Sequence, residues 1–158
     1  MRVLVEQISI QAEDKDLWSV MEDFGGVYKW APNMKKSALV GRQQTGVGTC
    51  RFLRHAWGFI LEEVVTEWTD GKGFSFDVYR APYPMKNVQE SWLAGRENGQ
   101  ATVITRVNYE MRLGIIGRLL DWVLVRHVVQ REMRTGLRGL KQYVEKKAQQ
   151  SGALRYAD

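Results

Sequence analysis

The chain has 158 residues and a net charge of +5, with 44% hydrophobic and 26% charged residues. This size suits one domain with its own core, and the composition is ordinary for a globular protein. No apolar run reaches the roughly 18 residues of a membrane-spanning helix, and the N-terminal residues lack a signal-peptide pattern. The single cysteine, Cys50, excludes an internal disulfide, so we expect a reducing compartment, the cytoplasm.

The first elements are predicted to be one strand and two short helices. Arg2–Ile10 is rich in β-branched residues and predicts the strand. Asp14 is placed to cap a helix over Asp14–Glu22. A second helical turn, Val27–Trp30, is stopped by Pro32.

From Met34 onward the hydrophobic pattern changes to a period of two, which is typical of strands. Thr69–Gly73 and Asn98-Gly99 are strong hairpin signals, whereas Ala81–Pro84 is a rigid break. Hairpin connections require an antiparallel sheet. The expected strands are Met34–Arg42, Gly48–His55, Gly58–Trp68, Phe74–Tyr79, Met85–Glu97 and Ala101–Leu113.

The last predicted element is one long helix from Gly117 to about Gln149, followed by a frayed tail over Ser151–Asp158. Winding the chain at ~100° per residue places its apolar residues in one stripe. The stripe consists of Ile115, Leu119, Trp122, Val129, Met133, Leu137, Leu140 and Val144. Such a helix needs a broad apolar surface, which the sheet supplies.

Two features of this stripe bear on function. Arg126 lies near its centre, and Gln130 follows one turn later. Gly136 and Gly139 interrupt the helix, each costing about 1 kcal/mol relative to alanine. Glycines there indicate a close approach to another backbone, or a hollow beneath the helix.

The order of elements predicts an α+β fold of the helix-grip kind, with residues 1–150 as a single domain. A curved antiparallel sheet of about seven strands wraps around the long C-terminal helix, and two short helices follow the first strand.

Three stretches resemble the START-like (SRPBCC) helix-grip superfamily, and in particular its polyketide cyclase/dehydrase and lipid-transport group. Val20–Pro32, with its Trp30-Ala31-Pro32 step, is similar to the group's entry from helix to strand. Thr45–Arg51 resembles its "TGVGTxR" segment, and Glu62–Trp68 its following "E-x-V-x-x-W" strand. Members share a cavity more than a catalytic signature.

The resemblance implies a hydrophobic cavity between the sheet and the long helix. Each candidate lining residue also fits a filled core, and a one-residue slip inverts a strand's faces. The candidates are Trp30, Phe59, Leu61, Glu63, Phe76, Tyr109, Met111, Trp122, Arg126, Gln130 and Met133.

The search for catalytic and metal motifs is negative. No hydrolase elbow, zinc-protease helix or phosphate-binding loop occurs, so we expect neither a metal nor a cofactor. Cys50 is expected to be buried, with Arg51 on the other face of its strand. Glu63 and Glu67 are expected to share a strand face, which makes one of them a candidate partner of Arg126.

Two function hypotheses remain open. In the first, the cavity binds or transports a lipid, a quinone or a polyketide-like molecule, and Arg126 with Tyr109 or Gln130 orients its polar end. In the second, a cyclase or dehydratase uses the same arginine to stabilise an enolate or phenolate while another side chain moves the proton. The absence of a compact catalytic motif favours binding.

The net positive charge raises the question of acidic partners. The arginines and lysines spread around the long helix without a nucleic-acid-binding motif, so a nucleic-acid partner is not expected. A solvated basic face is the simplest interpretation, and contact with an anionic membrane surface is the alternative. The oligomeric state stays open, since Trp122 and Val125 flank the stripe on different sides.

Overall fold

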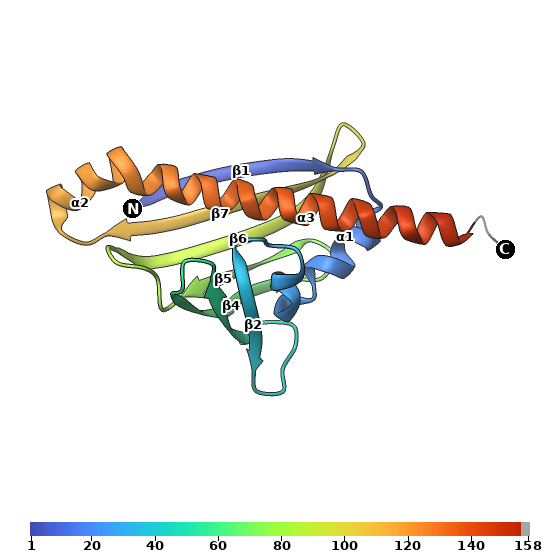
Figure 1. Ribbon diagram of the computed structural model, residues 1–158, viewed down its shortest axis with the longest axis horizontal. Coiled ribbons are helices and arrows are strands. Elements are labelled where there is room, and N and C mark those ends of the chain that lie inside the picture. Colours follow the sequence, from blue (N-terminus) through green and yellow to red (C-terminus); the bar gives the residue numbers. More distant parts are fainter. Residues whose placement is uncertain (156–158) are drawn as a thin grey trace.

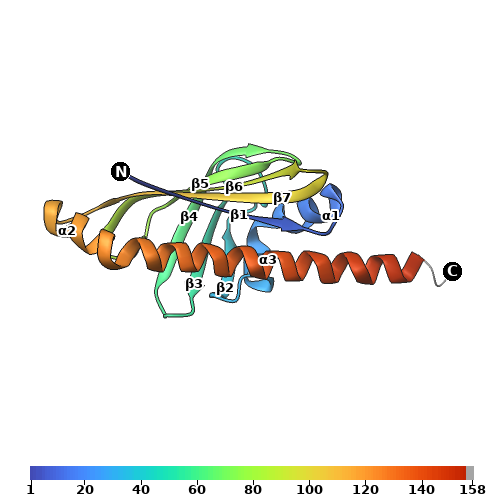
Figure 2. The ribbon, with the colours of Figure 1, turned by 90° about the horizontal axis from the view of Figure 1, so that it is seen from above.

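The computed structural model describes residues 1–155. A curved antiparallel sheet lies against one long helix that runs along it (Figures 1 and 2). This confirms the predicted helix-grip architecture. The elements are β1 (Arg2–Ile10), α1 (Asp14–Met21), the 3₁₀ helix η1 (Phe24–Lys29), β2 (Met34–Val40), β3 (Cys50–His55), β4 (Ile60–Thr69), β5 (Gly73–Val78), β6 (Met85–Glu97), β7 (Gln100–Met111), α2 (Gly114–Leu120), the π-helical segment η2 (Asp121–Val125) and α3 (Arg126–Arg155).

The sheet has the strand order β1-β7-β6-β5-β4-β3-β2. Strands β2 to β7 are joined as hairpin neighbours, and every pair is antiparallel. The first strand closes against the last, with Arg2 opposite Tyr109 and Ile10 opposite Ala101. Among the described residues, no helix has the length and apolar character needed to cross a membrane.

The long helix differs from its prediction at both ends. It begins as α2 at Gly114, passes through η2, and continues as α3 to Arg155. Residues 151–155 of the predicted frayed tail are therefore helical, and 156–158 lie outside the described residues.

Only the second half of the predicted stripe is buried. Met133, Leu137, Leu140 and Val144 pack into the core, whereas Ile115, Leu119 and Trp122 are exposed. The prediction was wrong for the first half for two reasons. The π-helical segment rotates the stripe relative to a regular helix, and α2 lies at the far end of the helix, where β7 ends (Figure 1).

The two helix glycines have different surroundings. A Cβ atom on Gly139 would lie 2.1 Å from the carbonyl oxygen of Trp30, so this glycine permits a close backbone approach between α3 and the residue that follows η1. A Cβ on Gly136 would lie 3.5 Å from the Trp92 ring, an ordinary contact. Gly136 instead borders a hollow.

Candidate ligand cavity

A cavity of about 480 Å³ lies between the inner face of the sheet and α3. Its walls are mainly aliphatic and aromatic side chains from the sheet, η1, α3 and the loop between β5 and β6. The predicted site residues that line it are Trp30, Phe59, Leu61, Glu63, Phe76 and Met133.

The other predicted site residues lie elsewhere. Tyr109 is fully buried in a separate cluster with Met111 beside it, and its hydroxyl donates to the carboxylate of Asp121. Trp122 is exposed, and the guanidinium of Arg126 lies 5.7 Å from the centre of its ring. Gln130 is half-buried outside the cavity wall. The structure therefore does not bring Arg126 into the cavity as the sequence predicted.

Instead, Arg51 is the guanidinium in the cavity wall. Its Nε donates to Glu63 Oε2 at 2.7 Å, its Nη2 lies 2.6 Å from the same oxygen, and its Nη1 donates to the Phe24 carbonyl. The group also lies 3.7 Å from the centre of the Phe24 ring. Because both side chains are almost fully buried, removing either partner leaves a buried charge.

Two strand predictions next to this pair need correction. Cys50 does face away from Arg51, but it is half-buried instead of buried. Burial raises the pKa of its thiol, which makes it a poor nucleophile. Glu67 does not share the face of Glu63, because a bulge between Val65 and Glu67 shifts the register of β4. Glu63 consequently pairs with Arg51, not with Arg126.

Glu90 is a second carboxyl group in the cavity wall, and sequence reasoning missed it. It lies on the inner face of β6 between Val88 and Trp92, both of which are buried. Burial raises the pKa of Glu90 to about 7, and the nearby charge of Glu63 contributes to this rise, while the Trp92 indole N–H, donating at 2.5 Å, opposes it. The sequence did contain a signal for it, namely a carboxylate at an inward position of a strand with alternating apolar residues.

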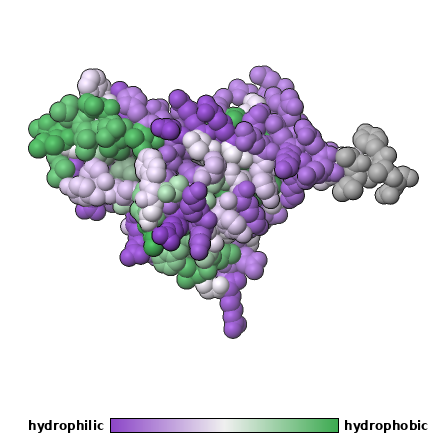
Figure 3. Space-filling view, viewed as in Figure 1, coloured by the Kyte–Doolittle hydropathy of each residue, from purple (hydrophilic) through white to green (hydrophobic). Residues whose placement is uncertain are grey.

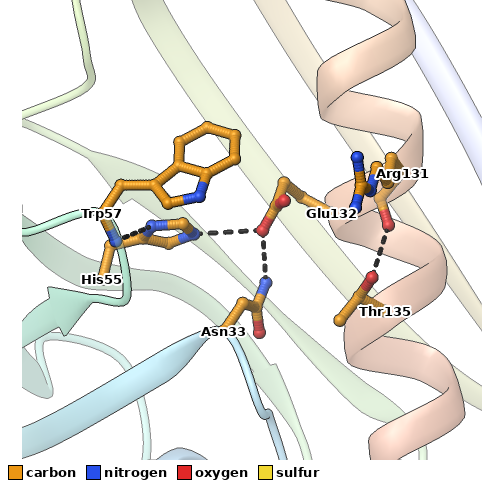
Figure 4. Close-up of polar contacts among 6 residues, drawn as sticks. All are labelled: Asn33, His55, Trp57, Arg131, Glu132 and Thr135. Atoms are coloured by element: carbon orange, nitrogen blue, oxygen red, sulfur yellow. Dashed lines mark hydrogen bonds and ion pairs between the residues drawn. The ribbon is translucent and has the colours of Figure 1, made fainter.

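A second polar cluster connects α3 with β3 and the start of β2 (Figure 4). The Trp57 backbone N–H donates to His55 Nδ1 at 3.1 Å, so the proton of the neutral imidazole sits on Nε2 and points to Glu132 Oε2 at 3.0 Å. Asn33 Nδ2 donates to the same oxygen at 2.9 Å. Phe59 stacks on the imidazole, with 4.4 Å between ring centres.

The two neighbours of Glu132 drawn in Figure 4 lie away from this cluster. The hydroxyl of Thr135 donates to the carbonyl of Arg131 within the helix at 2.9 Å. Of the three helix residues drawn in Figure 4, Glu132 is thus the one whose side chain contacts β3. Sequence reasoning missed the cluster because His55 and Glu132 lie 77 positions apart.

The cavity thus combines apolar walls with hydrogen-bond acceptors. The Oδ1 atom of Asn33 is buried and has no partner among the described residues. No group of histidine, cysteine and acidic side chains in the described part of the chain could hold a metal ion. The arrangement suits an apolar molecule with a polar end.

The model of the family described as polyketide cyclase/dehydrase and lipid transport matches residues 1–145. The chain belongs to this family. No curated protein matches it.

Solved structures show the same fold at low sequence identity. Protein XoxI from Bacillus cereus is 16% identical with a TM-score of 0.73, over 91% of this chain and 96% of that one. The ginseng major latex-like protein 151 from Panax ginseng is 13% identical with a TM-score of 0.73, over 90% and 96%. A protein from Thermus thermophilus, TTHA0849, is 19% identical with a TM-score of 0.73, over 93% and 99%.

Proposed function

We propose that this protein binds, and transfers between sites, an apolar small molecule such as a lipid, a quinone or a polyketide-like compound. The observation that carries the proposal is the apolar cavity of about 480 Å³. Ligand sites have volumes of ~300–1,000 Å³ with mostly apolar walls and few polar groups. A filled core would instead leave few voids larger than a water molecule. The family description, which includes lipid transport, agrees with this function.

The polar cluster supports a ligand that carries a hydroxyl group at one end. The unpartnered Oδ1 atom of Asn33 and the carboxylate of Glu132 both accept hydrogen bonds. Arg51, the one cationic side chain among the described residues that line the cavity, is already bonded to Glu63 and Phe24. A hydroxyl donor therefore fits the cavity better than an anionic head group.

Native mass spectrometry of freshly purified protein, with solvent extraction, tests the binding proposal. We expect one apolar molecule per chain. Gly136→Leu places a side chain into the hollow and should remove this molecule, whereas Gly152→Leu, on the same helix with nothing within 4 Å of a Cβ, should keep it. Equal ligand content in the two variants would count against the cavity as the binding site.

Titration with a long-chain fatty alcohol and its methyl ether tests the hydroxyl. We expect the parent protein to bind the alcohol roughly 10-fold more tightly, because the ether leaves the Asn33 acceptor unpaired. Asn33→Ala should reduce this preference, because Glu132 remains as the second acceptor. Asn108→Ala is the matched control, since Asn108 Oδ1 is also buried and unpartnered but lies outside this cavity. No preference in the parent protein would refute the hydroxyl assignment.

Glu90 supports a second candidate function, an enzyme of the cyclase or dehydratase type. A carboxyl group in the cavity wall whose pKa is about 7 can exchange a proton with a bound substrate near neutral pH. If so, the extracted ligand should change chemically on incubation with the protein. Glu90→Gln should then lower the rate by roughly 100-fold while the affinity is kept. An unaltered ligand after prolonged incubation would leave binding as the function.

We also propose that the protein acts in the cytoplasm. Its free cysteine, Cys50, suits a reducing compartment. If cell fractionation recovered the protein only among the secreted proteins, this location would be contradicted.

A further inference from the structure

The segment formed by α2 and η2, residues 114–125, turns its apolar side chains outward. Ile115 and Ile116 are 76% and 71% exposed. Figure 3 shows a hydrophobic patch at this end of the molecule. Exposed patches of this kind mark interaction surfaces. The apolar patch consists of Leu113, Ile115, Ile116, Leu119, Trp122, Val123 and Leu124, all more than half exposed.

The same segment is fixed to the protein by its small and polar residues. A Cβ on Gly117 would lie 1.8 Å from the Arg112 carbonyl oxygen, so the helix is seated directly on the end of β7. Asp121 is 2% exposed; Arg2 Nε donates to it at 2.7 Å, and the hydroxyl of Tyr109 donates to its other oxygen. A surface helix usually buries its apolar side, whereas this segment is held by its small and polar residues and exposes its apolar side. The apolar patch is therefore a fixed feature of the fold.

The exposed charged side chains within this stretch of the chain are all basic. Arg112, Arg118 and Arg131 are exposed, and Arg126 lies over the Trp122 ring. Between residues 112 and 131 the only acid is Asp121, which is buried. Arginine over an exposed indole is suited to an interface where one side is apolar and the other carries charge.

The patch is continuous with the mouth of the cavity. Leu120 and Leu124 are exposed and also line the cavity. Tyr83 and Trp57, which are exposed as well, line it from the loops between β5 and β6 and between β3 and β4. A molecule that covers the patch therefore lies beside the entrance.

We propose that the apolar patch docks on a membrane surface that contains anionic lipid, and that ligands exchange there between bilayer and cavity; the exchange rests on the proposed function. Apolar residues insert at the boundary of head groups and acyl chains, while the surrounding arginines attract anionic head groups. A partner protein would require a complementary acidic surface around an apolar groove, whereas an anionic bilayer supplies both properties at once.

Sedimentation with vesicles of phosphatidylcholine containing roughly one quarter phosphatidylglycerol tests the docking. The double substitution Ile115→Ser with Ile116→Ser should weaken vesicle binding by roughly 10-fold or more. Val40→Ser with Val47→Ser replaces two exposed apolar side chains outside the patch, on β2 and its following loop, and should bind as the parent does. The proposal is overturned if the parent does not sediment with vesicles, or if both double variants lose binding equally.

The arginines are tested separately. Arg118→Gln should weaken binding to the anionic vesicles by roughly 5-fold and leave binding to pure phosphatidylcholine unchanged. Arg138→Gln, an exposed arginine in the middle of α3, is the control and should have no effect. If both variants lost the same amount of vesicle binding, the net charge of the protein would explain the binding, and a local role of the arginine near the patch would be refuted.

Sedimentation velocity distinguishes two partners that could cover the apolar patch, a membrane and a second copy of the chain. We expect the parent protein to be a monomer without vesicles. A dimer that Ile115→Ser with Ile116→Ser converts to monomers would overturn the proposal. Gly136→Leu, with its cavity blocked, should still bind vesicles, so a failure of the ligand proposal is distinguishable from a failure of the docking proposal.

Discussion

Replacing Glu90 by glutamine should stabilise the protein, and only above mildly acidic pH. The pKa of this carboxyl is about 7 in the folded chain, against its ordinary value of 4.5. The cause is burial, with a further contribution from the charge of Glu63. Glutamine keeps the shape and still accepts the Trp92 indole N–H, but it carries no proton to lose.

The sign follows from which state releases its proton first. Below about pH 4.5 both the folded and the unfolded chain hold the proton, so the ionisation of Glu90 does not change the free energy of unfolding. Between about 4.5 and about 7 the unfolded chain ionises while the folded chain does not, so the free energy of unfolding falls as the pH rises. Above about 7 the full loss, about 3 kcal/mol, is present.

Urea unfolding of the parent and Glu90→Gln at several pH values measures this difference. We expect the two proteins to be equally stable near pH 4.5, and the variant to be more stable by about 2–3 kcal/mol near pH 8. Carboxyl groups that do not interact with Glu90 titrate alike in both proteins and cancel in the comparison, whereas Glu63 is coupled to Glu90 and contributes to the measured difference. A constant difference at all pH values, or a less stable variant near pH 8, would refute a raised pKa of Glu90 in the folded protein.

Further predictions concern the helix glycines and the buried ion pair. Gly139→Ala should destabilise the fold by about 1–3 kcal/mol, because its Cβ overlaps the Trp30 carbonyl. Gly136→Ala should stabilise the fold by up to about 1 kcal/mol, since the new Cβ fits. Melting temperatures that shift in the same direction in both variants would contradict this reasoning. Arg51→Met should cost about 3–5 kcal/mol by leaving Glu63 buried without its partner, while Arg51→Met with Glu63→Leu should restore most of that stability, as chemical unfolding can measure.

The fold was predictable because its signals are local. The bounds of Arg2–Ile10 and Met85–Glu97 agree with the predicted ones, since β-branched runs and the Asn98-Gly99 turn act within a few residues. Local signals fail where the backbone departs from a regular period. The π-helical segment after Leu120 and the bulge after Val65 each shift the phase of a pattern, and neither leaves a clear mark in the sequence.

The site was less predictable because it depends on distant pairings. Arg126 looked like a cavity cation only while the helix was assumed to be regular. Arg51 was passed over because an alternating strand predicts two faces without saying which of them is inward. His55 and Glu132 meet only once β3 and α3 are placed against each other. Glu90 is different, since its place between Val88 and Trp92 makes its inward position inferable from the alternation alone.

Several features that lower stability gather around one hollow, and this convergence is itself an argument for function. The half-buried acid Glu90, the unpartnered Asn33 oxygen and the helix glycine Gly136 all border the cavity. The exposed residues Leu120 and Leu124 lie at its mouth. Proteins retain features that lower stability mainly where function needs them. An apolar ligand that fills the hollow restores the missing packing contacts of its walls, so extraction of a bound ligand should lower the melting temperature of the parent protein more than that of Gly136→Leu.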